Sequence, residues 1–163
     1  MKARYKTNGF TLLELMVTMM IVSIVAMFGA PAFTDLLKQN KLTTQANSVL
    51  SAVNYARNQT INENNDVTIQ PIVASSNWSD GWSVVSTSDT RFFEAIKDAT
   101  LTLTHPDGDT TIVYQPDGSV DVDTAGVITL TLTPDDCTTG EDDIRVVTIS
   151  LPGAASISRN TCT

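Results

Sequence analysis

An apolar segment near the N-terminus limits this chain more strongly than any other feature of its sequence. Residues 10–33 are almost all apolar, and as a helix they would extend roughly 36 Å. The hydrocarbon core of a bilayer is about 30 Å thick, so the segment is long enough to span a membrane. It contains one acidic residue, Glu14. A carboxylate at the centre of a bilayer costs about 2.5 to 3.5 kcal/mol on insertion scales, so Glu14 needs a partner or a short path to water.

Charge is distributed unevenly on the two sides of this segment. Lys2, Arg4 and Lys6 precede it, whereas all 18 Asp and Glu residues come after them. This asymmetry predicts a short leader in the cytoplasm and an exported, acidic remainder. A cleaved secretory signal is the alternative, with a weak small-residue cleavage site within residues 27–32. That alternative would leave Glu14 inside the apolar core of the signal.

The helical spacing of apolar residues continues beyond Pro31, but only on one side. We therefore predict one helix from about Phe10 to Asn62, whose second half, residues 34–62, is amphipathic and ends at a polar cluster. Pro31 removes a backbone hydrogen bond and is expected to kink this helix. The predicted apolar face comprises Phe33, Leu36, Leu37, Leu42, Ala46, Val49, Leu50, Val53 and Ala56.

Short segments rich in Val, Ile and Thr follow the helix and predict a β-rich head over residues 63–163. The dipeptides Asp107-Gly108 and Asp117-Gly118 are typical of tight turns, so the segments beside each are predicted to pair as antiparallel hairpins. A long helix followed by such strands indicates an α+β fold with a sheet packed on the helix. The predicted strands are residues 67–73, 82–87, 101–105, 111–115, 127–133 and 144–151.

The sequence contains no recognisable catalytic motif. His105, the only histidine, stands beside Pro106 and a turn, and is expected to be an exposed loop side chain. Two cysteines and one histidine provide too few soft ligands for a zinc site. We therefore expect no enzyme activity, no metal site, no cofactor and no small-molecule substrate.

Two other groups of residues are expected to be structural. The acidic clusters at residues 121–123, 135–136 and 141–143 lack the spacing of an EF-hand calcium loop, so ordinary solvated charge is favoured over a weak calcium site. Trp78 and Trp82 flank a turn beside a strand, where packing is favoured over a binding platform.

Cys137 and Cys162 are the only cysteines, and both lie in the part predicted to be exported. An even pair in an oxidising compartment favours one disulfide, and two free buried thiols are the alternative. Nucleic-acid binding is not expected, because phosphate contacts need clustered basic residues and Arg145 and Arg159 stand apart in the sequence.

The sequence from Gly9 to Glu14, with basic residues before it and Pro31 after it, resembles the N-terminus of type IV prepilins. The resemblance implies a leader of residues 1–9, cleavage between Gly9 and Phe10 by a prepilin peptidase, and N-methylation of Phe10. It also implies a partner for Glu14, namely the Phe10 amine of a neighbouring subunit, which would set the register of the packed helices. The alternative is a Glu14 that reaches the nearby cytoplasmic surface.

Residues 50–61, with Trp78, Gly81 and Trp82, resemble minor pilins and pseudopilins of the GspH/FimT family. Some FimT-like proteins that bind DNA have a Gly-Arg-x-Arg stretch near the C-terminus. The corresponding residues here, 152–156, contain no arginine, so the resemblance is to FimU-like members and DNA binding is not carried over.

The resemblance therefore implies a minor type IV pilin that supports pilus assembly in the fibre or in a priming or tip complex. A GspH-type pseudopilin of a type II secretion system is the alternative, and a FimT-like DNA-uptake pilin is less favoured. The implied partners are other minor and major pilins, the prepilin peptidase and the inner membrane. Residues 10–33 would anchor the chain there with its head in the periplasm until it enters the pilus.

Overall fold

The computed structural model describes residues 9–73, 77–123, 126–140 and 144–162, and residues 29–32 only by their backbone. The chain divides into two compact units, one up to Lys38 and the other from Gln39 to Thr163. The first consists of the start of the long helix, and the second is the head.

The long helix α1 (Leu12–Glu63) begins with a hydrogen-bonded cap. Thr11 precedes it, and its Oγ1 accepts a hydrogen bond from the backbone N–H of Glu14 at 3.2 Å. The Thr11 carbonyl accepts the first helical hydrogen bond, from the N–H of Leu15 at 3.1 Å. Thr11 and Glu14 thus have the spacing of a capping box, which fixes the helix start two residues after Phe10. The helix continues through Pro31, and the predicted kink there stays a prediction.

The part of α1 that belongs to the head buries one face. Its buried positions recur every three or four residues, as one face of a helix requires. Within the head the burial begins at Leu42. Phe33, Leu36 and Leu37 belong to the first unit, where they are exposed, and their packing against a sheet stays a prediction. The helix ends at Glu63, within one residue of the prediction. The buried positions are Leu42, Ala46, Val49, Ala52, Val53, Ala56 and Thr60.

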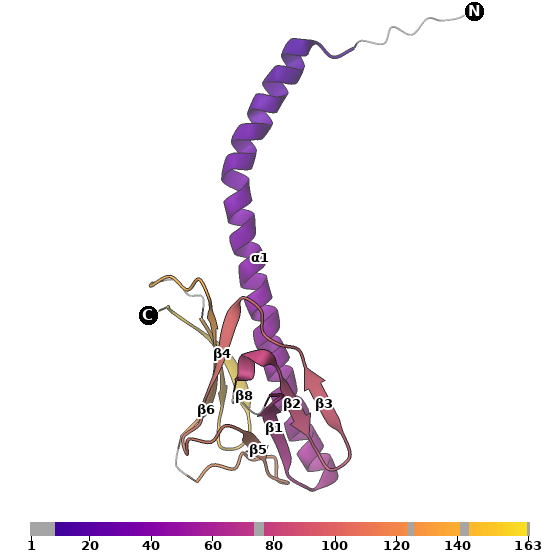
Figure 1. Ribbon diagram of the computed structural model, residues 1–163, viewed down its shortest axis with the longest axis vertical. Helices are drawn as coiled ribbons and strands as arrows, with labels where there is room; N and C mark the ends of the chain where they lie inside the picture. Colours follow the sequence, from indigo (N-terminus) through magenta and orange to yellow (C-terminus); the bar gives the residue numbers. More distant parts are fainter. Residues whose placement is uncertain (1–8, 74–76, 124–125, 141–143, 163) are drawn as a thin grey trace, which may run out of the picture. The chain divides into compact units, whose positions relative to one another are not determined.

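Two antiparallel four-stranded sheets complete the head, which confirms the α+β class (Figure 1). The first has the strand order β3-β2-β1-β5 and the second β4-β6-β7-β8. The prediction of a single sheet was therefore wrong, although the six predicted strands all exist. The bounds are β1 (Val67–Pro71), β2 (Trp82–Val85), β3 (Thr90–Phe93), β4 (Ala99–Thr104), β5 (Ile112–Tyr114), β6 (Ile128–Pro134), β7 (Ile144–Ile149) and β8 (Ala155–Asn160).

The predicted hairpins were wrong in their strand pairing. The Asp107-Gly108 turn joins β4 to β5, which lie in different sheets, where β4 pairs with β6 and β5 with β1. The Asp117-Gly118 turn does reverse the chain, but only as far as a single bridge between Tyr114 and Val120. A turn dipeptide determines a local reversal, whereas strand partners are selected by the apolar faces that the core must bury.

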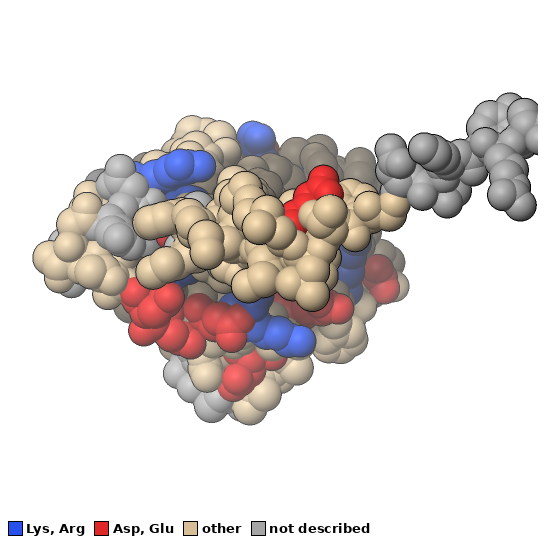
Figure 2. All heavy atoms as spheres, turned by 90° about the horizontal axis from the view of Figure 1, so that it is seen from above, with Lys and Arg blue, Asp and Glu red and all other residues tan. Residues whose placement is uncertain are grey.

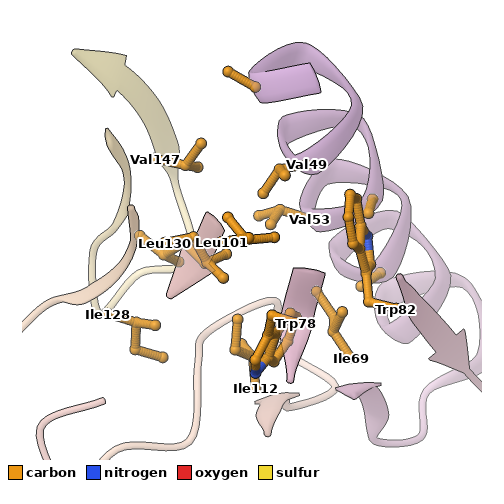
Figure 3. Close-up of a cluster of buried hydrophobic side chains, with 14 of the residues drawn as sticks. Val49, Val53, Ile69, Trp78, Trp82, Leu101, Ile112, Ile128, Leu130 and Val147 are labelled. Carbon is orange, nitrogen blue, oxygen red and sulfur yellow. The ribbon is translucent and has the colours of Figure 1, made fainter. Parts of the chain in front are cut away.

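The core lies between the head part of α1 and the inner faces of the two sheets (Figure 3). Val49 and Val53 of the helix point toward Leu101 and Leu130 of the second sheet. Trp82 stacks on Phe93 of the neighbouring strand, with ring centroids 5.8 Å apart and planes 7° from parallel. Trp78, in the short helix η1 (Trp78–Asp80), is also buried, so the prediction that both tryptophans pack in the core is confirmed.

Candidate assembly site

Gly9 and Phe10 lie just before the helix, in an exposed stretch of backbone. The Phe10 side chain is 80% exposed, and a Cβ added at Gly9 would meet no atom within 4 Å. This accessibility is what a processing enzyme needs at the bond between them. Lys2, Arg4 and Lys6, predicted as the basic leader, lie outside the described residues.

Glu14 is the third residue of α1 and is exposed. Its backbone N–H is satisfied by Thr11, but its carboxylate has no hydrogen bond or ion pair with any described residue. An acidic side chain in the first turn interacts favourably with the positive end of the helix dipole. Glu14 therefore helps to start the helix and leaves its charge available to an external partner. The capping contribution was not predicted, although Thr11 and Glu14 have its sequence signature.

The helix following Glu14 presents apolar side chains on all sides. Every described side chain of residues 10–28 is exposed, and the most apolar stretch has a mean hydropathy of 2.2. By length and composition, α1 is the one helix of the described residues that could cross a membrane. Its few polar groups are satisfied internally, since the hydroxyls of Thr18 and Ser23 donate to the carbonyls of Leu15 and Met19 at 2.8 Å. Such a surface suits lipid or the helices of other subunits.

Arg57 connects the helix to both sheets of the head. Its Nε donates to the carbonyl of Gly118, in the turn after β5, at 3.1 Å. Its Nη2 donates to the carbonyl of Pro152, in the turn between β7 and β8, also at 3.1 Å. Arg57 lies within residues 50–61, the segment that resembles the GspH/FimT family, and this bridge is a structural reason for an arginine there.

Comparison with known protein families gives one match for the N-terminal segment and another for the head. Residues 4–30, which include Gly9, Phe10 and Glu14, match the prokaryotic N-terminal methylation motif. Residues 45–153, more than half of the chain, match the family model described as Type II transport protein GspH. The chain belongs to the GspH family. With the methylation motif, this places it among the minor type IV pilins and pseudopilins.

Two solved structures have the same fold as this GspH-family chain. Both are crystal structures of the type IV minor pilin FimU of Pseudomonas aeruginosa strain PAO1. In space group P21, the match has 19% identity and a TM-score of 0.56, and covers 78% of this chain and 99% of FimU. In space group P65, the match has 17% identity and a TM-score of 0.56, and covers 74% of this chain and 99% of FimU. A search of curated protein sequences found no match.

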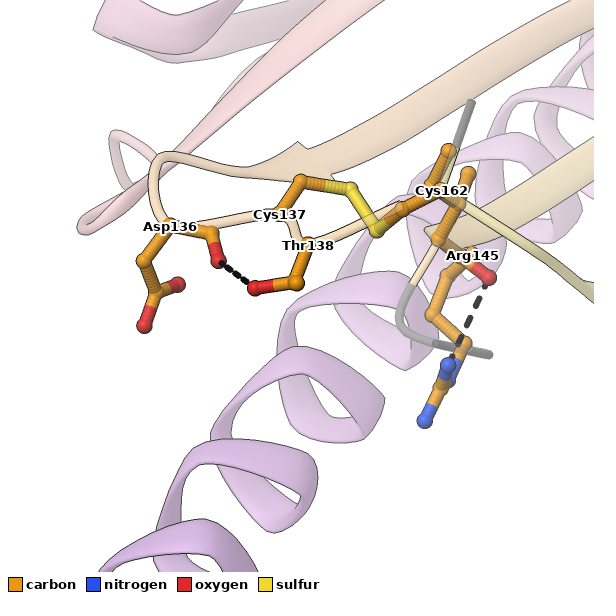
Figure 4. The surroundings of a disulfide bond; sticks show 6 residues. Asp136, Cys137, Thr138, Arg145 and Cys162 are labelled. Carbon is orange, nitrogen blue, oxygen red and sulfur yellow. Dashed lines mark hydrogen bonds between the residues drawn. A yellow bond between two sulfur atoms is a disulfide. The ribbon is translucent and has the colours of Figure 1, made fainter. Parts of the chain in front are cut away.

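The cysteines of the GspH-family chain form the predicted disulfide (Figure 4). Cys137, after β6, is bonded to Cys162, after β8, with their Cα atoms 5.7 Å apart. Cys162 is buried. The bond therefore ties the end of the last strand, which lies at the edge of the second sheet, to the segment that follows β6.

Arg145 and Arg159 are not separate, contrary to the prediction. They are direct partners in the antiparallel register of β7 and β8. Together with Thr43 and Asn47 they line a hollow of about 190 Å³. Arg145 is 2% exposed and donates to Gln39 Oε1 of the helix. In the view of Figure 2, the described basic side chains lie in separate groups with acidic ones nearby, not in one strip.

His105 is buried, so the prediction of an exposed loop side chain was wrong. It follows β4 directly, and its side chain is 1% exposed.

The acidic residues considered as calcium ligands have different surroundings. Asp121 accepts a hydrogen bond from Gln115 Nε2 at 3.0 Å, Asp135 and Asp136 are exposed, and residues 141–143 lie outside the described residues.

Proposed function

We propose that this chain is a minor type IV pilin that supports assembly of a pilus, in the fibre or in the complex that primes or tips it. The observation that carries the proposal is the exposed Glu14 carboxylate on an uncovered apolar helix, next to an accessible Gly9-Phe10 bond. The methylation motif over these residues and the FimU-like fold of the head support it.

In this proposal the leader, residues 1–9, is removed by a prepilin peptidase and the new Phe10 amine is methylated. The chain resides in the inner membrane through residues 10–33, with its head in the periplasm. On assembly, the Glu14 carboxylate pairs with the Phe10 amine of a neighbouring pilin. A paired carboxylate is tolerated in an apolar medium, and pairing at one depth sets the stagger between helices.

Processing can be tested on the protein isolated from its own bacterium. Mass spectrometry of the N-terminal peptide should show a chain that begins at Phe10 and is heavier by one methyl group. Replacing Gly9 by Val should leave residues 1–9 attached. A wild-type chain that retains Met1, or a Gly9→Val chain that is still shortened, would contradict the proposed processing.

A test of Glu14 needs variants that separate the effect of its charge from the effect of its position in the helix cap. Glu14→Gln removes the charge but keeps a residue suited to a capping box, whereas Thr11→Ala removes only the hydroxyl that caps the helix. We expect Glu14→Gln to reduce surface pili and co-purification with other minor pilins, at unchanged protein levels in the membrane. Thr11→Ala should have a much smaller effect. Normal assembly with Glu14→Gln would remove the charge from the mechanism.

The GspH description of the family model favours one second candidate, a minor pseudopilin of a type II secretion system. Deleting the gene and counting both surface pili and secreted proteins distinguishes the two. Loss of pili with normal secretion supports the pilin proposal. Loss of secretion with normal pili would replace it by the pseudopilin.

A further inference from the structure

A buried imidazole and two carboxylates meet in the connection between β4 and β5. His105 is buried, and its Nδ1 accepts a hydrogen bond from the backbone N–H of Asp107 at 3.3 Å. This distance is longer than the usual 2.7 to 3.2 Å, so the bond is weak. The ring makes no other hydrogen bond with the described residues. A buried polar ring held only in this way is costly unless another group interacts with it.

The two carboxylates are brought to the ring by the turn. His105, Asp107 and Asp109 alternate along the chain around Gly108, which has a φ of +81° and whose N–H donates to the His105 carbonyl at 3.1 Å. One oxygen of Asp107 lies 3.9 Å from His105 Nδ1. One ligand atom from each of the three residues lies within 4.8 Å of the others.

The surroundings hold one carboxylate in place and leave the other accessible. Asp107 Oδ2 accepts a hydrogen bond from the backbone N–H of Asp123 at 2.8 Å, as carboxylates that bind metals are commonly held by an outer hydrogen bond. Asp109 is exposed, and with His105 it lines an open cavity of about 510 Å³ that also contacts Trp78. An ion can therefore reach the buried imidazole from this side.

We propose that His105, Asp107 and Asp109 bind a divalent transition-metal ion of the Zn²⁺ type. An imidazole nitrogen with two carboxylate oxygens suits zinc better than calcium, which prefers oxygen alone. Tetrahedral ligands at about 2.0 to 2.2 Å from zinc lie roughly 3.4 Å from each other. His105 Nδ1 and the Asp107 oxygen, 3.9 Å apart, would therefore need to approach by about 0.5 Å, and the whole set, now within 4.8 Å, by up to about 1.4 Å. Zinc at Nδ1 would take the lone pair that now accepts the weak hydrogen bond from Asp107. The fourth position is open to water or to a side chain of a neighbouring subunit.

This site differs from the expectation of no metal, which rested on the small number of cysteines and histidines. Two carboxylates provide the remaining metal ligands instead. The bound ion would fix residues 105–109, in the connection that leads from β4 in one sheet to β5 in the other, and the Asp107 carboxylate would link it to Asp123 in the segment before β6. It would therefore stabilise the connection between the sheets.

The test uses the full chain in detergent, without an affinity tag and treated with EDTA. Titration with ZnCl₂ followed by calorimetry should show one ion per chain, and Co²⁺ should give the absorption bands of a nitrogen- and oxygen-ligated ion. Asp109→Asn, at an exposed position, should weaken Zn²⁺ binding by more than about tenfold, since even outer partners of metal ligands contribute on that scale. His105→Gln should weaken Zn²⁺ binding by a similar factor.

Asp117→Asn is the matched control, because residues 116–118 repeat the Pro-Asp-Gly sequence of residues 106–108 without a histidine beside them. Its affinity for Zn²⁺ should equal that of the unmodified chain. Absence of stoichiometric Zn²⁺ binding, equal binding by Asp109→Asn, or preferential binding of Ca²⁺ would each overturn the proposal. If His105→Gln does not fold, Asp109→Asn alone decides the result.

Discussion

The carboxylate of Glu63, the last residue of α1, accepts a hydrogen bond from the backbone N–H of Thr87 at 3.1 Å. The same carboxylate accepts hydrogen bonds from the hydroxyls of Ser86, Thr87 and Ser88 and from the Gln59 amide. An acidic residue at a helix C-terminus is unfavourable for the helix dipole. These hydrogen bonds offset that effect and tie the end of the helix to the connection between β2 and β3.

Stability should therefore depend on the ionisation of Glu63. The hydrogen bond from Ser88, followed by those from Gln59, Thr87 and Ser86, lowers the pKa of Glu63 from 4.5 to about 2. Because this pKa is lower in the folded protein, ionised Glu63 stabilises the fold above about pH 4.5, and the contribution is lost as the pH falls toward 2. We expect Glu63→Gln to be less stable than wild type at pH 6, with the difference vanishing near pH 2. Urea denaturation at several pH values measures this.

Glu94→Gln is the control for that series. Glu94 is exposed and has no hydrogen bond or ion pair with the described residues. Its substitution should leave the pH dependence unchanged. A Glu63→Gln protein with the same pH profile as Glu94→Gln would mean that the hydrogen bonds at Glu63 do not stabilise the fold.

The core between the helix and the sheets should be sensitive to truncation at Leu130. This β6 side chain is 1% exposed, and Leu130→Ala should lower the free energy of unfolding by about 2 to 5 kcal/mol through lost burial and the cavity left behind. Leu151, in the turn after β7, is 42% exposed, and Leu151→Ala should cost much less. Equal effects in urea denaturation would contradict the core described above.

The disulfide should stabilise the folded protein because it closes a loop of the chain. Cys137 and Cys162 are 25 residues apart, and a loop of this length gives about 3 kcal/mol in the chain-entropy model. The double variant Cys137→Ser/Cys162→Ser should lose stability by about that amount. The oxidised wild-type chain should show no free thiol under denaturing conditions. Two titratable thiols in the purified protein would reject the bond.

Gly153 should not accept a side chain, because it faces the turn after β5 at close range. Its φ is +79°, and a Cβ built there would lie 1.9 Å from the carbonyl oxygen of Gly118. Gly140 has a φ of +97° but no atom within 4 Å of such a Cβ. Gly140→Ala should therefore show only the backbone cost of about 1 to 2 kcal/mol, and Gly153→Ala should show a larger loss. Similar thermal midpoints for the two variants would contradict the close contact.

The strongest local patterns in the sequence predicted the fold class, the long helix and six strands. The strands β3 and β8 were missed for a physical reason. Neither strand contains a fully buried residue, since β3 (Thr90–Phe93) is almost wholly exposed and β8 (Ala155–Asn160) is half-buried or exposed, so neither has the run of Val, Ile and Thr that marked the other strands.

Most of the features that could not be predicted depend on strand pairing between residues far apart in the sequence. Arg145 and Arg159 become neighbours only through the register of β7 and β8, and His105 is buried where the chain passes from β4 in one sheet to β5 in the other. The N-terminal motif, in contrast, is contiguous, and the match to the methylation motif confirms it. The individual roles of Gly9, Phe10 and Glu14 stay predictions.

The buried face of α1 in the head also determines how that domain would respond to mechanical load. Its side chains from Leu42 to Thr60 are packed in the core, and the Thr60 hydroxyl donates to the Tyr114 carbonyl at 3.1 Å. Tension applied along the helix would act on these contacts in shear, so they would have to break together instead of one after another. The head would therefore resist such tension until most of these contacts broke at once.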